Sequence, residues 1–241
     1  MSVPLRTVDR MTSADGTAHL VWDWNGTLLH DIDAVLEATN AALACVGHGP
    51  LTLARYRELY CVPVPRFYQR LLGRSPIEAE WSVMDAAFHR TYDRAVQRVG
   101  LTEGAAELLA ERQAAGWTHS VCSLAPHEQV VSLVRRHGIA RHFVRVDGHP
   151  RRVATAGKAA QMARHLATLT GVRPERVVVI GDAVDDAVAA AHIGAHAVLY
   201  TGGSHSRRSL QAAGVPVVDT LAEATALAER LAGGEAVAGQ R

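Results

Sequence analysis

The chain has 241 residues, which is enough for one substantial hydrophobic core, or for one core and a small accessory domain. Apolar residues make up 48% and charged residues 20%, as in ordinary soluble globular enzymes. The 25 basic residues nearly balance the 24 acidic ones, so the charge gives no footprint for nucleic acid or for an anionic membrane surface. A small molecule is therefore the expected partner, and the sequence leaves the oligomeric state open.

The three cysteines, Cys45, Cys61 and Cys122, are an odd number without a C-x-x-C spacing, so neither a disulfide framework nor a zinc site is indicated. No apolar run approaches the ~20 residues that span a bilayer. The first residues lack the apolar stretch of a signal peptide. We therefore expect a cytoplasmic protein.

Lys158 is the only lysine in the chain, because all the other basic residues are arginine. A compact ammonium that neutralises one oxyanion is not easily replaced by a planar guanidinium. Lys158 is thus a candidate functional residue on composition alone. The alternative is that it is a chance survivor on a surface helix.

The chain begins with a polar stretch, residues 1–18, that has no periodicity and predicts a loose tail. Residues 19–31 follow, in which an apolar run with β-branched and aromatic residues stops at Asp23 and a Gly-Thr turn comes next. This pattern is typical of a buried strand that delivers a carboxylate to its C-terminal end. Ligand sites of open α/β sheets lie at such strand ends.

The next segments predict an all-helical insertion over residues 32–100. Apolar residues recur there at spacings of three and four, with prolines at helix starts and glycines as stops. The expected helices cover residues 31–46, 52–61, 64–73 and 75–99.

From Leu101 onward the pattern alternates between helix and strand, which specifies a parallel sheet with helices on both faces. The expected strands are 117–123, 143–147, 176–181, 196–200 and 215–218. The expected helices are 102–115, 127–137, 156–170, 184–193, 205–213 and 220–232. Residues 233–241 predict a second loose end.

Acidic residues follow the strand that ends at Gly181. Four consecutive β-branched residues precede that glycine, and Asp182 and Asp186 come after it. Two carboxylates at a strand end are costly unless a cation lies between them, and hard oxygen ligands suit Mg²⁺. Taken alone, the same pattern is also that of a helix N-cap with first-turn acids.

Residues 23–28, Asp-Trp-Asn-Gly-Thr-Leu, resemble motif I of the haloacid dehalogenase (HAD) superfamily, Asp-x-Asp-Gly-Thr-Leu, with Asn25 in place of the second aspartate. Three further positions are similar to the remaining motifs of the family. Ser123 at a strand end matches motif II, Lys158 matches motif III, and Gly181-Asp182-x-x-x-Asp186 matches motif IV. The resemblance covers residues 19–232. The order of the elements is similar to that of phosphoglycolate phosphatases. It implies a Rossmann-like core of residues 19–31 and 101–232, with the helices of 32–100 as a cap.

This resemblance implies an Mg²⁺-dependent phosphatase acting on a small phosphorylated metabolite. Asp23 would be the nucleophile that forms an aspartyl-phosphate, while Ser123 and Lys158 bind the phosphate. Asp23 and Asp182 would ligate the metal directly, Asn25 through its backbone carbonyl, and Asp186 through a coordinated water.

Asn25 cannot serve as the general acid and base that the second aspartate supplies, because an amide has no proton to exchange at neutral pH. Four explanations compete: leaving groups acidic enough to need no proton, a substitute group such as His30 or one from the cap, deamidation of the Asn25-Gly26 pair, and loss of turnover. We favour the first two, because the other motif residues remain. The last would make the chain a catalytically weakened or non-catalytic phospholigand-binding or regulatory protein.

Substrate-contacting candidates in the cap are Tyr60, Arg66, Phe67 and Tyr68, around a Val-Pro-Val-Pro turn. Arg66 could pair with a carboxylate or a second phosphate. The alternative is that the aromatic residues form the cap core and Arg66 is solvated. The cap contains no lysine, which argues against the Schiff base of phosphonatases.

Overall fold

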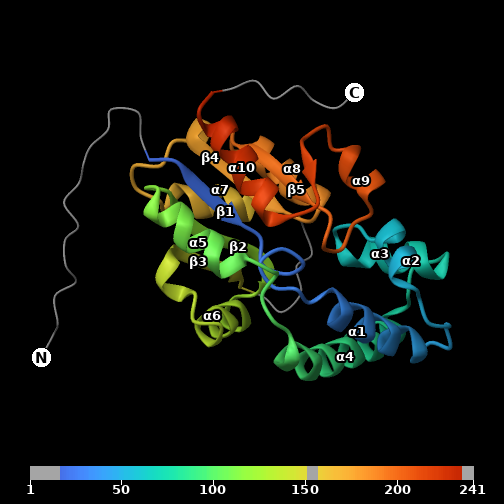
Figure 1. Ribbon diagram of the computed structural model, residues 1–241. Helices are drawn as coiled ribbons and strands as arrows, with labels where there is room; N and C mark the ends of the chain where they lie inside the picture. Colours follow the sequence, from blue (N-terminus) through green and yellow to red (C-terminus); the bar gives the residue numbers. More distant parts are fainter. Residues whose placement is uncertain (1–16, 151–156, 235–241) are drawn as a thin grey trace, which may run out of the picture.

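A parallel sheet forms the centre of the computed structural model, which describes residues 17–150 and 157–234. Within these residues, six strands pair in the order β3-β2-β1-β4-β5-β6, and every neighbouring pair is parallel (Figure 1). The strands are β1 (His19–Trp22), β2 (Thr118–Pro126), β3 (Phe143–His149), β4 (Val177–Gly181), β5 (His196–Tyr200) and β6 (Val217–Val218). The α/β fold with a parallel sheet, predicted from the alternating pattern, is confirmed.

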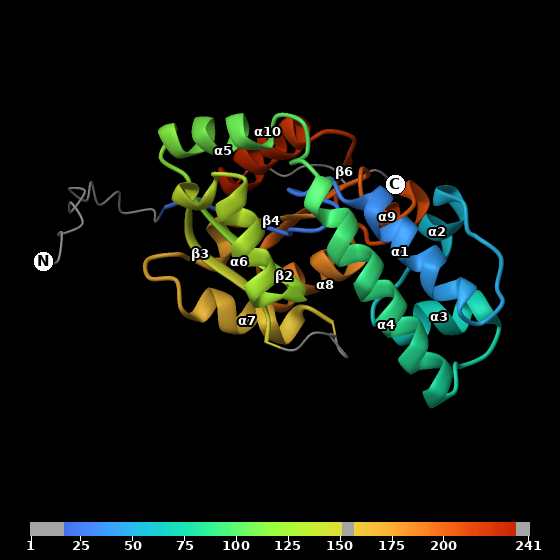
Figure 2. The ribbon, with the colours of Figure 1, turned by 90° about the horizontal axis from the view of Figure 1, so that it is seen from below.

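Both faces of the sheet are buried, because alternate side chains of each strand enter different cores. Leu20 and Trp22 of β1 belong to one core, and Val21 belongs to the other. The first face is covered by α5 (Ala105–Ala114), α6 (His127–Arg136) and α10 (Leu221–Ala232). The second is covered by α7 (Ala159–Ala167), α8 (Val184–His192) and α9 (Arg207–Gln211). Figure 2 shows α5 and α10 on one side of the sheet and α7 on the other.

Four helices between β1 and α5 form what we call the helical insertion, residues 32–98. They are α1 (Ile32–Ala44), α2 (Leu53–Leu59), α3 (Val64–Leu72) and α4 (Glu78–Ala95), and a 3₁₀ turn, Val96–Arg98, follows α4. The insertion lies to one side of the sheet (Figures 1 and 2) and has its own core, which includes Leu43, Tyr56, Phe67 and Met84. The insertion therefore buries much of its apolar surface within itself rather than against the sheet.

Several predicted boundaries shift for identifiable reasons. The helix expected to start at residue 75 starts at Glu78, because the Glu80 carboxylate accepts a hydrogen bond from the Ile77 N–H at 3.1 Å. The helix expected from residue 102 starts at Ala105, because the Thr102 N–H donates to the Leu28 carbonyl at 2.9 Å. The strand expected to stop at residue 123 continues to Pro126.

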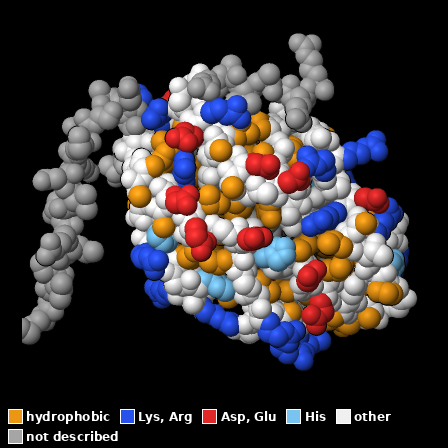
Figure 3. All heavy atoms as spheres, in the orientation of Figure 1, with side chains coloured by type: hydrophobic (Ala, Val, Ile, Leu, Met, Phe, Trp, Pro, Cys, Tyr) orange, Lys and Arg blue, Asp and Glu red, His pale blue; other side chains and the backbone are white. Residues whose placement is uncertain are grey.

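The predicted loose ends fall mostly on residues 1–16 and 235–241, which lie outside the described residues, as does the first residue of the helix expected at 156–170. None of the helices in the described ranges has both the length and the hydropathy that crossing a bilayer requires. On the face seen in Figure 3, acidic and basic side chains are interspersed, as the near-zero net charge leads one to expect.

Candidate active site

The carboxyl ends of β1 and β4 bring two aspartates together. The strands are neighbours with Trp22 beside Ile180, and Asp23 and Asp182 each follow closely on a strand end. The Asp23 N–H donates to the Ile180 carbonyl at 2.9 Å, which extends the pairing by one residue. The order of the strands therefore places these carboxylates at the edge of the sheet where ligands bind.

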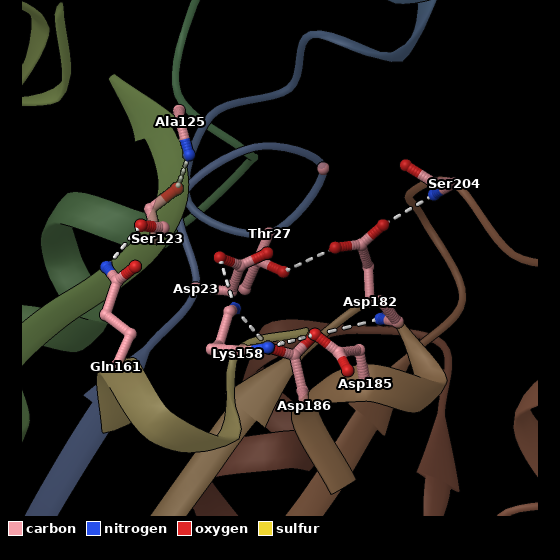
Figure 4. Close-up of polar contacts among 12 residues, drawn as sticks. Asp23, Thr27, Ser123, Ala125, Lys158, Gln161, Asp182, Asp185, Asp186 and Ser204 are labelled. Carbon is pink, nitrogen blue, oxygen red and sulfur yellow. Dashed lines mark hydrogen bonds and ion pairs between the residues drawn. The ribbon is translucent and has the colours of Figure 1, made fainter. Parts of the chain in front are cut away.

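Lys158, just before α7, joins this pair to a third carboxylate. Its Nζ donates to Asp23 Oδ1 at 2.7 Å and also forms an ion pair with Asp186 (Figure 4). Its backbone N–H donates to Asp185 Oδ2 at 2.6 Å, which fixes the start of the helix. Lys158 is 3% exposed and is thus a buried, paired ammonium.

Close backbone packing fixes Asp182. Its carboxylate accepts hydrogen bonds from the Ser204 N–H at 2.6 Å and from Thr27 Oγ1 at 3.4 Å. A Cβ on Gly203 would lie 2.1 Å from Asp182 Oδ2, and one on Gly26, whose φ is +70°, would lie 2.7 Å from the same atom. Only glycine at these two positions leaves room for the carboxylate.

Asp23, Asp182 and Asp186 offer carboxylate oxygens that all lie within 4.8 Å of one another. They are 8%, 2% and 0% exposed, and the Lys158 ammonium balances only one of the three negative charges. Buried like charges of this kind call for a cation, and oxygen donors suit Mg²⁺. The donor set thus fits a magnesium ion.

The electrostatics agree with this charge imbalance. Burial raises the pKa of Asp23 well above its usual value against the attraction of Lys158, and Asp186 and Asp182 raise it further. Burial and Asp186 raise the pKa of Asp182 to about 6. Burial alone would lower the pKa of Lys158, but Asp186 and Asp23 outweigh it and raise that pKa well above its usual value. Lys158 is therefore charged across the physiological range.

Ser123 comes from β2, on the other side of β1. Its Oγ accepts a hydrogen bond from the Ala125 N–H at 3.1 Å, which leaves the hydroxyl hydrogen available for donation. Its carbonyl accepts from Gln161 Nε2 at 2.7 Å, so α7 holds both Lys158 and the strand end in register. Ser123 thus lies where the sequence predicted it, beside the carboxylates (Figure 4).

Asn25 takes part in a network that the sequence did not predict. Its Nδ2 lies 2.6 Å from Asp31 Oδ2 and 2.6 Å from the Tyr92 hydroxyl oxygen, and the Tyr92 hydroxyl donates to the same Asp31 oxygen at 2.6 Å. The Gly26 N–H donates to Asp31 Oδ1 at 2.7 Å. Burial raises the pKa of Asp31 against these hydrogen bonds. Asn25 therefore donates a hydrogen bond to a buried carboxyl, and Asp31 and Tyr92 both contact its side chain.

A cavity of about 240 Å³ lies over these groups and is lined by both the sheet edge and the helical insertion. Tyr60, Phe67 and Tyr68 are among its lining residues, and Phe67 and Tyr68 also belong to the buried core of the insertion. Arg66 is exposed and is not among them, so it drops out of the candidate substrate contacts. His30, considered as a substitute acid, is also exposed and outside the lining.

Comparisons with known proteins agree with this geometry. A family model described as haloacid dehalogenase-like hydrolase matches residues 17–194. A phosphoglycolate phosphatase of Cereibacter sphaeroides is 27% identical over 191 residues, which cover 76% of this chain and 85% of that protein. A phosphoglycolate phosphatase of Synechococcus elongatus is 26% identical over 195 residues, covering 80% and 88%.

Among solved structures, that of a predicted phosphatase from Clostridium acetobutylicum matches with a TM-score of 0.76, at 16% identity, over 89% of this chain and 98% of the other. At this identity the likeness shows the fold alone. The family model covers most of the chain, and the curated relatives are phosphatases. The chain therefore belongs to the haloacid dehalogenase-like hydrolase family.

Proposed function

We propose that the protein is an Mg²⁺-dependent phosphatase that hydrolyses a small phosphorylated metabolite through an aspartyl-phosphate on Asp23. The observation that carries the proposal is the buried Lys158 ammonium between Asp23 and Asp186, with Asp182 beside them. This arrangement supports Asp23 as the nucleophile, Lys158 as the cation for the transferring phosphoryl group, and Asp23 with Asp182 as the metal-binding pair.

Asp23 would attack phosphorus in line, so that a carboxylate oxygen–phosphorus bond forms while the bond to the leaving oxygen breaks. The leaving oxygen departs with the electron pair. Water then attacks phosphorus, releases inorganic phosphate and regenerates Asp23. Lys158 and the Ser123 hydroxyl offset the negative charge on the phosphoryl oxygens during both steps.

Asp23 and Asp182 would hold the Mg²⁺ ion directly, with the Asn25 carbonyl as a further ligand and Asp186 acting through a water. When bound, the ion supplies positive charge that polarises the phosphoryl group. The excess negative charge of the three buried carboxylates supports this assignment.

We propose that the helical insertion acts as a cap over the cavity. Arg57 of α2 donates from Nε to the Gly203 carbonyl at 2.8 Å and from Nη2 to the Gly202 carbonyl at 2.9 Å. The Ser206 N–H donates to the Arg57 carbonyl at 3.0 Å. These contacts tie the insertion to the loop that positions Asp182, and a closed cap excludes water from phosphoryl transfer.

Asn25 supports a second candidate, a catalytically weakened or non-catalytic protein that binds a phosphorylated ligand. The Asn25 amide donates to Asp31 and has no proton to give a leaving group. General acid–base help is worth about 10²- to 10⁴-fold, so its absence slows turnover without abolishing it for acidic leaving groups.

The test is phosphate release by the full-length protein with Mg²⁺ and with EDTA, for wild type, Asp23→Asn and a control, Asp33→Asn. Asp33 is an exposed aspartate in the first turn of α1. We expect turnover that EDTA removes, a loss of at least ~10³-fold in Asp23→Asn and little change in the control. Turnover that survives in Asp23→Asn would overturn the mechanism. Inactive wild type that still binds phosphate with Mg²⁺ would favour the binding protein.

A further inference from the structure

The cavity over the carboxylates concentrates the aromatic residues of the chain. The chain contains four Trp, five Tyr and three Phe residues, and seven of these twelve line the cavity. All seven come from the helical insertion: Tyr56, Tyr60, Phe67, Tyr68, Trp81, Phe88 and Tyr92. Such a wall suits an apolar ring more than a small hydrophilic acid.

The rings form connected groups around the cavity. Tyr60 lies 5.2 Å from Tyr56 and 5.3 Å from Phe67 between ring centroids, and Trp81 lies 5.6 Å from Tyr68. Tyr60 and Trp81 are half-buried, whereas Tyr56 and Phe67 are almost completely buried. The first two therefore keep ring surface available to a ligand, while the others hold them in place.

The described lining residues offer a second anionic group no free counterion. Lys158 is the sole lysine or arginine among them, and it is paired with Asp23 and Asp186. His89 Nε2 lies 3.3 Å from Asp85, so an acidic residue accompanies it in the same wall. Among the described lining residues, a substrate carboxylate would be desolvated without a partner, which costs free energy.

The absence of a general acid at Asn25 also favours an aromatic leaving group. With no acid beside the leaving oxygen, the bond from phosphorus breaks most readily when the oxygen leaves as a stable anion. The pKa of a phenol is about 10, far below that of an aliphatic alcohol. A phenolate can depart with the electron pair and take its proton from water after release.

We propose that the substrates of this site are phosphate monoesters of phenols that carry no further acidic group on the ring. The inference rests on the proposed phosphatase function. A cavity of about 150 Å³ holds benzene, so the observed volume of about 240 Å³ accommodates one ring beside the phosphoryl site. The ring would lie against this aromatic wall, which includes Tyr60 and Trp81, with the phosphoryl group at Asp23 and Lys158.

Four probes separate the two parts of the inference. Phenyl phosphate has a ring and an acidic leaving group, benzyl phosphate has the ring alone, acetyl phosphate has the acidic leaving group alone, and phosphoglycolate has neither. We expect kcat/KM for phenyl phosphate to exceed that for phosphoglycolate by at least about tenfold, and benzyl phosphate to show a similar KM with a lower kcat.

Variants Tyr60→Leu and Trp81→Leu test the ring contacts. Each is expected to raise KM for phenyl phosphate about tenfold while KM for acetyl phosphate, which also reports correct folding, stays within about twofold. An equal effect on both substrates would show that these rings act only in folding and would overturn the inference.

Phosphoglycolate hydrolysed as well as phenyl phosphate would overturn the inference and leave the phosphatase function standing. Benzyl phosphate turned over as fast as phenyl phosphate would overturn the leaving-group part. No turnover of phenyl phosphate with Mg²⁺ would overturn the inference, whereas turnover of phenyl phosphate that survives in Asp23→Asn would overturn the proposed function itself.

Discussion

Asn25 and Asp31 are joined by a hydrogen bond of 2.6 Å, in which the amide nitrogen faces the buried carboxyl. An aspartate at position 25 would instead place two carboxyls together in a buried site, where like charges repel and one must take up a proton. Asn25 therefore forms part of a local arrangement in which the carboxyl group is supplied by Asp31, six positions later.

This relationship predicts that Asn25→Asp alone will not restore an efficient acid–base group. We expect it to lower the free energy of unfolding by about 1–3 kcal/mol, because the Asp31 carboxyl loses a donor and gains a like charge. The double variant Asn25→Asp with Asp31→Asn exchanges the two groups. It should recover that stability and raise kcat for benzyl phosphate by at least about tenfold.

Urea unfolding and steady-state kinetics on the three proteins measure these effects. A single variant as stable as wild type would show that Asp31 is protonated and donates to position 25, contrary to the arrangement inferred here. Asp31→Asn alone is the matched control, since it removes the carboxyl without adding one.

The strand-end residues of the site were predictable, because their positions follow from local pattern. An apolar run that stops at Asp23 and another that stops before Asp182 define two strand ends, and parallel strands bring such ends to one edge. Lys158 was predictable from composition, because it is the only lysine in the chain. The observed ion pair of Lys158 with Asp23 follows from these signals.

The contacts of Asp31 and Tyr92 were not predictable in this way. Asp31 precedes α1 and has the pattern of a first-turn acid. Its contact with Asn25 requires the intervening turn to fold back, with the Leu29 N–H donating to the Trp24 carbonyl at 2.9 Å. Tyr92 reaches Asn25 from 67 positions away. The sequence also did not determine which face of α3 is buried. In the structure Arg66 is exposed to solvent, while Phe67 is buried.

Lys158 is predicted not to tolerate arginine. Its ammonium is enclosed between two carboxylates in a buried site, and a planar guanidinium needs more room and a forked partner. We expect both Lys158→Arg and Lys158→Met to lose at least ~10²-fold in kcat. Lys158→Met should also be destabilised by about 3–5 kcal/mol, because the buried carboxylates lose their cation.

Phosphate release measures the loss of kcat, and thermal unfolding with and without Mg²⁺ measures the loss of stability. The control is Arg164→Lys, the reverse exchange at an exposed position on the same helix, which should change neither quantity. Activity retained in Lys158→Arg would mean that general positive charge suffices.

Acid should destabilise the fold through two buried histidines, His19 and His119. Burial lowers the pKa of His19 to about 3 and that of His119 to about 4. His119 Nδ1 accepts a hydrogen bond from Trp22 Nε1 at 3.2 Å, and His19 lies 2.8 Å from Ser120 Oγ. Both rings are therefore neutral in the folded state at neutral pH.

The sign follows from linkage, because the unfolded chain protonates each histidine near pH 6.5 and the folded chain does not until pH 4 or below. Stability is complete above about pH 6.5 and falls as the pH decreases toward 4, by up to about 1.4 kcal/mol per pH unit for each histidine. His119→Gln should reduce that slope, measured by urea unfolding between pH 7 and 4.5. The exposed control His192→Gln should not.

Arg57 is predicted to hold the helical insertion over the site. Its guanidinium donates to two successive carbonyls, Gly202 and Gly203, and Gly203 packs against the Asp182 carboxylate. Arg57→Ala should therefore raise KM and lower kcat together, with kcat/KM reduced about 10- to 100-fold, because the cap no longer registers with the loop. Arg57→Lys should recover little, since a single ammonium cannot reproduce the fork.

Arg55→Ala is the matched control on the same helix. Arg55 is exposed and pairs only at the surface with Glu58, at 3.0 Å, where an ion pair contributes at most about 1 kcal/mol. Steady-state kinetics of both alanine variants on phenyl and acetyl phosphate decide the matter. If Arg57→Ala behaves like Arg55→Ala, the contact between α2 and the 202–206 loop has no part in closing the site, and the insertion must be held by its packing alone.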